Sequence, residues 1–280
     1  MISTIHLSSN QNPPKNLFQS MTLPQLLGRN YKWWYVMIFN YRSASAYFWS
    51  DLYYYLNQIL TSYISIVIWQ YSNRGDTSET LNYLLFGNII LSLTLLNNHW
   101  RMSMEVFGGK FSSRLLLPIS LTKFYFFNAL AYSFKASIVV IFYVPLFAYF
   151  RESLIINWFG LLILITYLPL IYLTKFFYNK LVASTVFYLT NNEGVLSFSE
   201  TILVILSGGL IPLSIVKLDF LYFTPFAFLL HHPMQIYLGK YSQLEILQTF
   251  GGGIIWCLVL FILARIVFKA GLKRNEAVGL

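Results

Sequence analysis

Residues 101–123, RMSMEVFGGKFSSRLLLPISLTK, form a polar island between two long apolar runs. Its charged residues are Arg101, Glu105, Lys110, Arg114 and Lys123, in a chain of which only 10% is charged. Met102, Val106 and Phe107 recur at helical spacing, and Gly108-Gly109 ends that helical turn. The pattern predicts a short amphipathic helix and a sharp turn at one face of a membrane.

The composition is that of a membrane protein. Of the 280 residues, 57% are hydrophobic and 19% aromatic, whereas a soluble domain is about half apolar and a quarter charged. Several uncharged stretches of about twenty residues are long enough, as helices, to cross a bilayer core of about 30 Å. Backbone groups in lipid must be hydrogen-bonded internally, and the chain lacks the alternating pattern of a barrel. We therefore predict an all-α membrane protein.

Apolar runs predict six transmembrane helices. They cover approximately residues 48–70, 81–99, 126–150, 154–174, 195–213 and 251–268. Residues 26–47 fit two interpretations equally well, an N-terminal interfacial helix or a cytoplasmic extension of the first span. Residues 175–193 are predicted to continue the fourth span as a helix. Residues 214–249 are too interrupted for a span and too apolar for a loop, so re-entrant or interfacial helices are expected before the last span.

The transmembrane domain is expected over residues 26–270. Residues 1–25 are polar and lack the apolar core of a signal peptide, so we expect a flexible cytoplasmic tail there. Residues 271–280 form a second, basic cytoplasmic tail. The single cysteine, Cys257, excludes an internal disulfide.

Basic residues predict the orientation. Six spans place both ends of the chain, the island and residues 175–193 on the same side of the membrane. The segments on that side carry fourteen Lys and Arg residues, and those on the other side carry four. The four are Arg74, Arg151, Lys217 and Lys240. The positive-inside rule therefore puts both termini and the island in the cytoplasm. The net charge of +9 comes from basic residues that are spread in small groups beside the apolar runs. It therefore does not indicate a nucleic acid partner.

Two stretches together resemble the ABC-2 family of ATP-binding-cassette permeases, of the six-span kind made separately from its ATPase. GGKFSSRLLLPIS, residues 108–120, is similar to the family's cytoplasmic segment after span two. SGGLIPLSIV (207–216), FLYFTPFAFLLHHPMQIYLG (220–239) and KRNEAVGL (273–280) follow the family's closing pattern. The resemblance covers about residues 26–280 and depends on the order of these parts.

This resemblance implies an architecture and a mode of action. Two permease subunits, identical or different, pair to form a pathway in the bacterial inner membrane. Each binds a cytoplasmic ATPase through a coupling helix between spans two and three. ATP and Mg would be bound by that partner ATPase, with no cofactor on this chain. Membrane lipids are the other expected partner.

The island has residues suited to docking. Its Gly109-Lys110 lacks the upstream Gly and the following Ser or Thr of a P-loop, so nucleotide hydrolysis must occur on another chain. The predicted docking residues are Arg101, Met102, Glu105, Val106, Phe107, Lys110 and Arg114. Glu105 would pair with a basic residue of the ATPase, and the apolar side chains would fill a groove on it. The alternative is a helix that rests on lipid headgroups.

Three other sites are predicted. Lys135 lies within an apolar run, where its stem would reach the interface; the alternative is contact with an anionic, lipid-like substrate or lipid. Ser207, Gly208 and Gly209 would permit close packing, with the subunit seam as one location. His231-His232 is interpreted as structural or interfacial rather than metal-binding, because adjacent helical residues point about 100° apart. No catalytic arrangement can be assembled.

The expected function is that of a permease subunit of an ABC-2 exporter for an amphipathic, lipid-like or drug-like substrate. A non-transporting membrane scaffold or assembly factor is the alternative. The lack of convergent ionisable residues argues against an intramembrane enzyme.

Overall fold

The computed structural model describes residues 31–44, 48–72, 77–116, 120–150, 154, 156–189, 191–216 and 218–274, and these residues form helices and no strand. The elements are α2 (Tyr31–Ala44), α3 (Phe48–Ser72), α4 (Thr77–Leu93), α5 (Asn98–Phe107), α6 (Phe111–Leu115), α7 (Leu121–Ala136), α8 (Val139–Phe142), α9 (Val144–Tyr149), α10 (Trp158–Ala183), η4 (Ser184–Phe187), α11 (Glu193–Ser207), α12 (Leu213–Val216), η5 (Asp219–Phe223), η6 (Ala227–Leu229), α13 (His231–Tyr237) and α14 (Gln243–Leu272). The predicted tail over 1–25, and residues 275–280 of the other, lie outside the described part.

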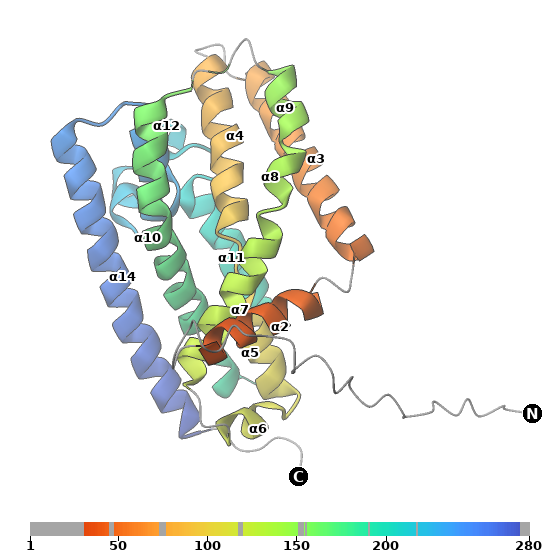
Figure 1. Ribbon diagram of the computed structural model, residues 1–280. Helices are drawn as coiled ribbons and strands as arrows, with labels where there is room; N and C mark the ends of the chain where they lie inside the picture. Colours follow the sequence, from red (N-terminus) through yellow and green to blue (C-terminus); the bar gives the residue numbers. More distant parts are fainter. Residues whose placement is uncertain are drawn as a thin grey trace, which may run out of the picture.

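The long helices run side by side between two ends of a bundle (Figure 1). One end, called the island end, contains α2, α5, α6 and the last turns of α14. The opposite end, called the far end, contains the first turns of α4, α10 and α14 and the last turns of α9. The segments that the positive-inside rule grouped together, as far as they are described, therefore gather at the island end.

Four helical segments are long and apolar enough to cross a membrane. They are Ser78–Phe107, Leu121–Tyr149, Trp158–Phe187 and Gln243–Leu272, and they correspond to the second, third, fourth and sixth predicted spans. Helix α3 has 25 residues but is too polar to count with them. Helix α11 has only 15 residues and measures about 22 Å, short of a bilayer core of about 30 Å. Four of the six predicted spans are thus confirmed as membrane-crossing candidates.

Side-chain caps explain where two helices depart from the predicted bounds. Helix α10 begins at Trp158 rather than at 154 because Asn157 Oδ1 accepts the Gly160 N–H at 3.0 Å. Helix α14 begins at Gln243, well before 251, because Ser242 and Glu245 form a capping box. The continuation of the fourth span is confirmed to residue 187 by α10 and η4.

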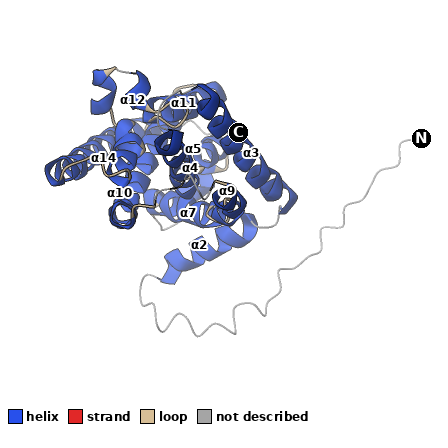
Figure 2. Cartoon of the chain, turned by 90° about the horizontal axis from the view of Figure 1, so that it is seen from above, coloured by secondary structure: helices blue, strands red, loops and turns tan. Residues whose placement is uncertain are grey.

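Helix α2 is separate from α3 rather than an extension of it. It lies across the island end outside the bundle, beside α7, in both views (Figures 1 and 2). Trp33 is buried and its ring stacks on Phe127 of α7 with centroids 5.6 Å apart. Trp34 is 45% exposed, so only one of these two tryptophans faces outward.

Residues 213–237 form short helices, as their interrupted pattern predicted. Elements α12, η5, η6 and α13 lie at the far end, where α13 and η6 pack against α10 and contact α4, α11 and α14. Protein contacts thus cover α13 and η6, as irregular backbone near a membrane requires.

Two large apolar clusters fill the bundle, one toward each end, and a third, of Leu213, Leu221 and Ala227, lies among the short helices. The larger surrounds Tyr143, Tyr167 and Tyr237, all fully buried. The smaller of the two large clusters joins α5, α6, α7, α10 and α14 around Phe111 and Phe176. The island helices α5 and α6 therefore pack on an apolar cluster that is separate from the largest one.

Gly208 brings the end of α11 against α4. Its backbone is left-handed, with φ +87°, and this ends α11 at Ser207 instead of allowing it to continue to 213. Tyr83 of α4 donates a hydrogen bond to the Gly208 carbonyl at 3.1 Å. A Cβ atom at Gly208 would lie 2.6 Å from the Tyr83 hydroxyl oxygen.

We expect Gly208→Ala to lower the melting temperature of the detergent-solubilised protein. The left-handed conformation alone costs a non-glycine residue about 1–2 kcal/mol, and Tyr83 must also move. Gly194→Ala is the matched control, because a Cβ there meets nothing within 4 Å and alanine favours the helix. Equal melting temperatures for Gly208→Ala and the wild type would contradict this account.

Candidate functional site

The island folds as two short helices joined by a tight turn. Helix α5 ends at Phe107, and the N–H groups of Gly108 and Gly109 return to the carbonyls of Met104 and Val106 at 3.0 and 3.1 Å. Gly109 has φ +71°, which lets the chain reverse into α6. The predicted helix and turn are confirmed, although α5 begins at Asn98, before the island itself.

The Glu105 carboxylate is the centre of an ion-pair network. Its Oε1 accepts from Arg101 Nε at 3.2 Å and from Arg114 Nη2 at 3.1 Å, while its Oε2 accepts from Arg114 Nε at 3.3 Å and Tyr125 Oη at 2.8 Å. Arg101 Nη1 also donates to Asn40 Oδ1 of α2 at 3.0 Å. One carboxylate therefore links α5 and α6 to α7 directly, and to α2 through Arg101.

Phe124 lies beneath both guanidinium groups of this network. The Cζ atoms of Arg114 and Arg101 are 4.6 and 5.6 Å from its ring centroid. The side chains of Arg101 and Arg114 are each 31% exposed and that of Glu105 only 11%. Because the charges are partly removed from water, their attraction is stronger than between surface residues.

Three of the predicted docking residues face the interior. Met102 and Val106 are buried in the smaller apolar cluster, and Glu105 is buried in its network. These side chains hold the island to its own bundle, which corrects the expectation that they point toward a partner. The docking role of the island as a whole stays a prediction.

A different set of side chains forms the outward face of the island. Met104 is 58% exposed, Phe107 59% and Leu116 86%, and Lys110 and Leu115 are exposed beside them. Of these five, the sequence singled out only Phe107 and Lys110. The signal for Met104 is its position three residues before Phe107, on the same side of α5. We call these five residues the outward patch.

A second polar group lies at the junction between α4 and α5. His99 Nε2 and Trp100 Nε1 donate to Glu200 Oε1 of α11 at 2.8 and 2.9 Å. Lys175 of α10 is buried and donates to Thr94 Oγ1 at 3.3 Å. No sequence pattern predicts this group, because its members are far apart along the chain and each is an isolated polar residue in an apolar run.

Lys135 lies inside the bundle, well along α7. Helix α7 begins at Leu121, so Lys135 lies about 21 Å along it. Its side chain is inside the protein, with the residue only 7% exposed, and its backbone carbonyl accepts from Tyr55 Oη at 2.9 Å. Other helices therefore cover this lysine, and its reach to the membrane interface stays a prediction. Its contact with substrate or lipid stays a prediction.

The close packing predicted for Ser207, Gly208 and Gly209 occurs within the chain. Ser207 is fully buried, and a Cβ atom at Gly209 would lie 3.0 Å from Leu91 Cδ1 of α4. These contacts join α11 to α4 of the same chain, and a role at a subunit seam stays a prediction.

The two adjacent histidines belong to an aromatic group at the far end. His232 Nε2 donates to the Tyr222 carbonyl at 2.8 Å, and Nδ1 accepts from Tyr241 Oη at 2.7 Å. His231 is buried with its ring 5.0 Å from that of Tyr222, and burial lowers its pKa to about 3. Across the described ranges, no group of three or more His, Cys, Asp and Glu is arranged to hold a metal ion.

A family comparison decides the class of protein. The model for ABC-2 family transporter proteins matches residues 76–279, which include the island, the four apolar segments and the short helices of the far end. The chain belongs to the ABC-2 transporter family. This membership confirms the resemblance that GGKFSSRLLLPIS and the closing segments predicted, and it makes the chain a multi-pass membrane protein of transport type. No curated protein and no solved structure matches the chain.

We expect Glu105→Gln to destabilise this ABC-2 protein, because two guanidinium groups lose their shared anion. Hydrogen bonds to charged groups contribute about 1.5–3 kcal/mol in favourable cases, and the partial exposure of the arginines reduces this, so a loss of about 2 kcal/mol is expected. Glu193→Gln, at the exposed start of α11, should cost about 0.5 kcal/mol or less. Thermal unfolding in detergent measures both, and equal losses would contradict a central role for Glu105.

Proposed function

We propose that the chain is the permease subunit of an ABC-2 exporter. It would move an amphipathic, lipid-like or drug-like substrate out of the cell, using ATP hydrolysed with Mg by a separate ATPase. The observation that carries this proposal is the island, a helix pair at the basic end of the bundle with an apolar, exposed outward patch. A patch of this kind, rimmed by charge, is typical of a surface that binds a partner.

The ATPase would dock on the outward patch. Met104, Phe107 and Leu116 present apolar surface, and Lys110 adds a positive charge that would select an acidic rim on the partner. An exposed helix side of this form suits a hydrophobic groove on the partner. The buried Met102, Val106 and Glu105 network would contribute indirectly, by holding α5 in its orientation.

Movement of the ATPase would be transmitted to the membrane-spanning helices through the Glu105 ion-pair network. Glu105 ties α5 and α6 to α7, and Arg101 ties them to α2, so a push on the patch would displace these helices together. ATP binding would then favour one of two arrangements of the spans through its different affinity for each.

The proposed topology has six crossings, with α3 and α11 as the first and fifth. Support comes from the alternating direction of successive long helices and from the basic residues at the island end (Figure 1). Both termini would lie in the cytoplasm of a bacterial cell, α2 would lie in the interface, and the short helices would face outside. A second permease subunit, identical or related, would complete the pathway.

Removing the two central apolar side chains of the outward patch should weaken ATPase binding. We expect a Met104→Ala, Phe107→Ala double variant to bind at least about tenfold more weakly, as for a central pair of contact residues. The measurement is recovery of a co-expressed P-loop ATPase, encoded in a neighbouring reading frame, with the purified chain in nanodiscs. Phe223→Ala, with a phenylalanine 76% exposed at the far end, is the matched control.

Two outcomes would contradict the proposal at different levels. Equal recovery with the double variant and the wild type would show that the outward patch is not the docking surface. No recovery with the wild type, with or without ATP, would remove the exporter proposal and favour the membrane scaffold or assembly factor.

A further inference from the structure

A polar and aromatic pocket of about 730 Å³ lies among the short helices and the first turns of α14, at the far end (Figure 1). Tyr222, Phe228 and Tyr241 are among the aromatic side chains that line it. Its volume is in the range of about 300–1,000 Å³ that small-molecule sites occupy. Among its described lining residues, none is aliphatic and none is Lys or Arg. This pocket, called the far-end pocket, therefore suits neither an acyl chain nor an anion.

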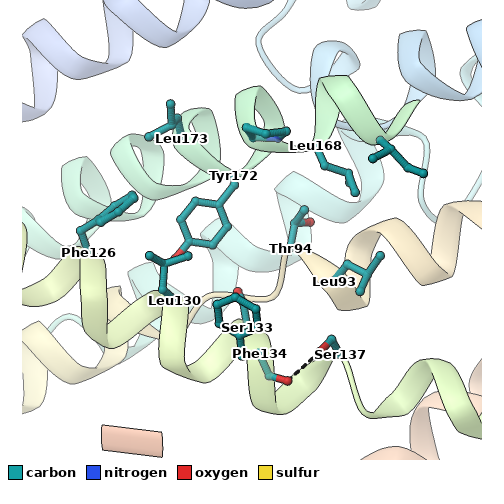
Figure 3. A pocket seen from close by; sticks show the side chains of 12 residues that line it. Leu93, Thr94, Phe126, Leu130, Ser133, Phe134, Ser137, Leu168, Tyr172 and Leu173 are labelled. Atoms are coloured by element: carbon teal, nitrogen blue, oxygen red, sulfur yellow. Dashed lines mark hydrogen bonds between the residues drawn. The ribbon is translucent and has the colours of Figure 1, made fainter. Parts of the chain in front are cut away.

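A second pocket, between α4, α7 and α10, has a different lining (Figure 3). Its volume is about 540 Å³, and Leu93, Leu130, Leu168 and Leu173 give it an apolar wall. Because the hydrophobic effect has no direction, an apolar wall selects no particular occupant. The far-end pocket combines aromatic rings with polar side chains, and this combination narrows the chemistry of its ligand.

Hydrogen bonds hold the aromatic walls of the far-end pocket in place. His232 Nε2 donates to the Tyr222 carbonyl at 2.8 Å, and its Nδ1 accepts from Tyr241 Oη at 2.7 Å. Tyr222 Oη donates to the Leu213 carbonyl at 3.2 Å, and the Phe228 ring lies 4.5 Å from that of His232. Both tyrosine hydroxyl protons are therefore used within the protein. These preorganised rings offer a ligand mainly apolar surface.

Two polar side chains of this pocket have no partner within the protein. Gln235 of α13 is 6% exposed and Thr249 of α14 is 4% exposed, and neither side chain makes a hydrogen bond within the described ranges. Protein atoms do not enclose their polar atoms, so these atoms open on the pocket that both residues line. An amide and a hydroxyl are thus available to a ligand, and a buried polar group gains from such a partner.

The charges of the pocket disfavour anionic ligands. Burial lowers the pKa of His231 to about 3 and also lowers the pKa of His232, so both rings are neutral at physiological pH. Glu245 lines the pocket from the exposed start of α14, and hydrogen bonds from Ser242 lower the pKa of its carboxyl group. The ionised group among the described lining residues is therefore negative.

The hydrogen-bonding groups distinguish between neutral and cationic ligands. Gln235 offers two donors and an acceptor oxygen, and Thr249 offers one donor and one acceptor. An organic ammonium ion can only donate, so it would leave the amide N–H groups of Gln235 unpaired. A sugar hydroxyl both donates and accepts, and a pyranose ring also has C–H groups that pack on aromatic rings. A neutral sugar therefore matches both the polar and the aromatic parts of the pocket.

We propose that the far-end pocket binds a neutral sugar ring, with Gln235 and Thr249 hydrogen-bonded to its hydroxyl groups. Tyr222, Phe228 and Tyr241 pack against its C–H surface. Sugar binding here depends on the fold of the far end and does not rest on the docking of an ATPase.

The test is saturation-transfer difference NMR on the purified chain in nanodiscs of phosphatidylethanolamine and phosphatidylglycerol, without an ATPase. The probes are the methyl pyranosides of glucose, galactose, mannose and N-acetylglucosamine, with choline as a cationic probe and empty nanodiscs as background. At least one pyranoside should receive saturation, most strongly at its ring C–H protons. Choline should receive no more than in empty nanodiscs.

Substitutions of the two available polar groups identify the site. Gln235→Leu removes the amide at similar size and should raise the dissociation constant of the bound pyranoside about tenfold, and Thr249→Val about threefold. Gln243→Leu, exposed on α14 and outside the pocket lining, is the matched control and should leave it unchanged. Because Gln235 has no partner within the protein, Gln235→Leu should not lower the melting temperature without sugar, whereas the loss of a structural contact would.

Three results would overturn sugar binding. Saturation of no pyranoside would show that water alone fills the pocket, and stronger binding of choline than of every pyranoside would assign the pocket to an organic cation. Equal dissociation constants for the wild type and Thr249→Val would place the sugar elsewhere, even if Gln235→Leu failed to fold. Sugar binding by a chain that recovers no ATPase would leave this inference standing while the exporter proposal failed.

Discussion

The arrangement of the island end depends on one buried carboxylate. Helices α5 and α6 have ten and five residues, too few to be stable alone, so contacts with the rest of the chain must hold them. Glu105 supplies the polar part of these contacts to Arg101, Arg114 and Tyr125. A partly buried charge is tolerated only while its partners stay in place, so the members of this network keep or lose their positions together.

Polar contacts also tie α5 to the helices on its other side. Asn179 of α10 donates to Asn98 Oδ1 at 3.4 Å, and Asn192, just before α11, donates to Ser103 Oγ at 2.7 Å. With the His99 contact to Glu200, these bonds connect α5 to α10 and α11. Contacts with α2, α7, α10 and α11 therefore hold the described part of the island, while the outward patch is exposed. A force applied there would be passed to helices on both sides of the bundle.

The sequence predicted the features that depend on composition and local order. Apolar runs located the membrane segments, Gly108-Gly109 located the turn of the island, and basic residues grouped the segments that lie at the island end. The same information could not show which side of α5 is covered. Helical spacing identified Met102 and Val106 as one apolar side, but lipid, a partner and the chain's own core all select the same pattern.

Other features depend on contacts between distant parts of the chain. The start of α10 depends on the Asn157 cap, whose side chain also donates to the Tyr237 carbonyl at 3.0 Å. The burial of Lys135 depends on how α7 packs against the neighbouring helices. None of these leaves a periodic or local signal. Each had to be found in the arrangement of the helices.

The most direct test of the central claim is a distance measurement between α2 and the island. Spin labels would be attached to cysteines at Phe39, 72% exposed on α2, and at the exposed Ser113 of α6, with Cys257 changed to Ala. Pulsed electron paramagnetic resonance of the chain in nanodiscs should give a narrow distance distribution that broadens in Glu105→Gln but not in Glu193→Gln. Distributions of equal width in all three proteins would show that Glu105 does not hold the island to α2.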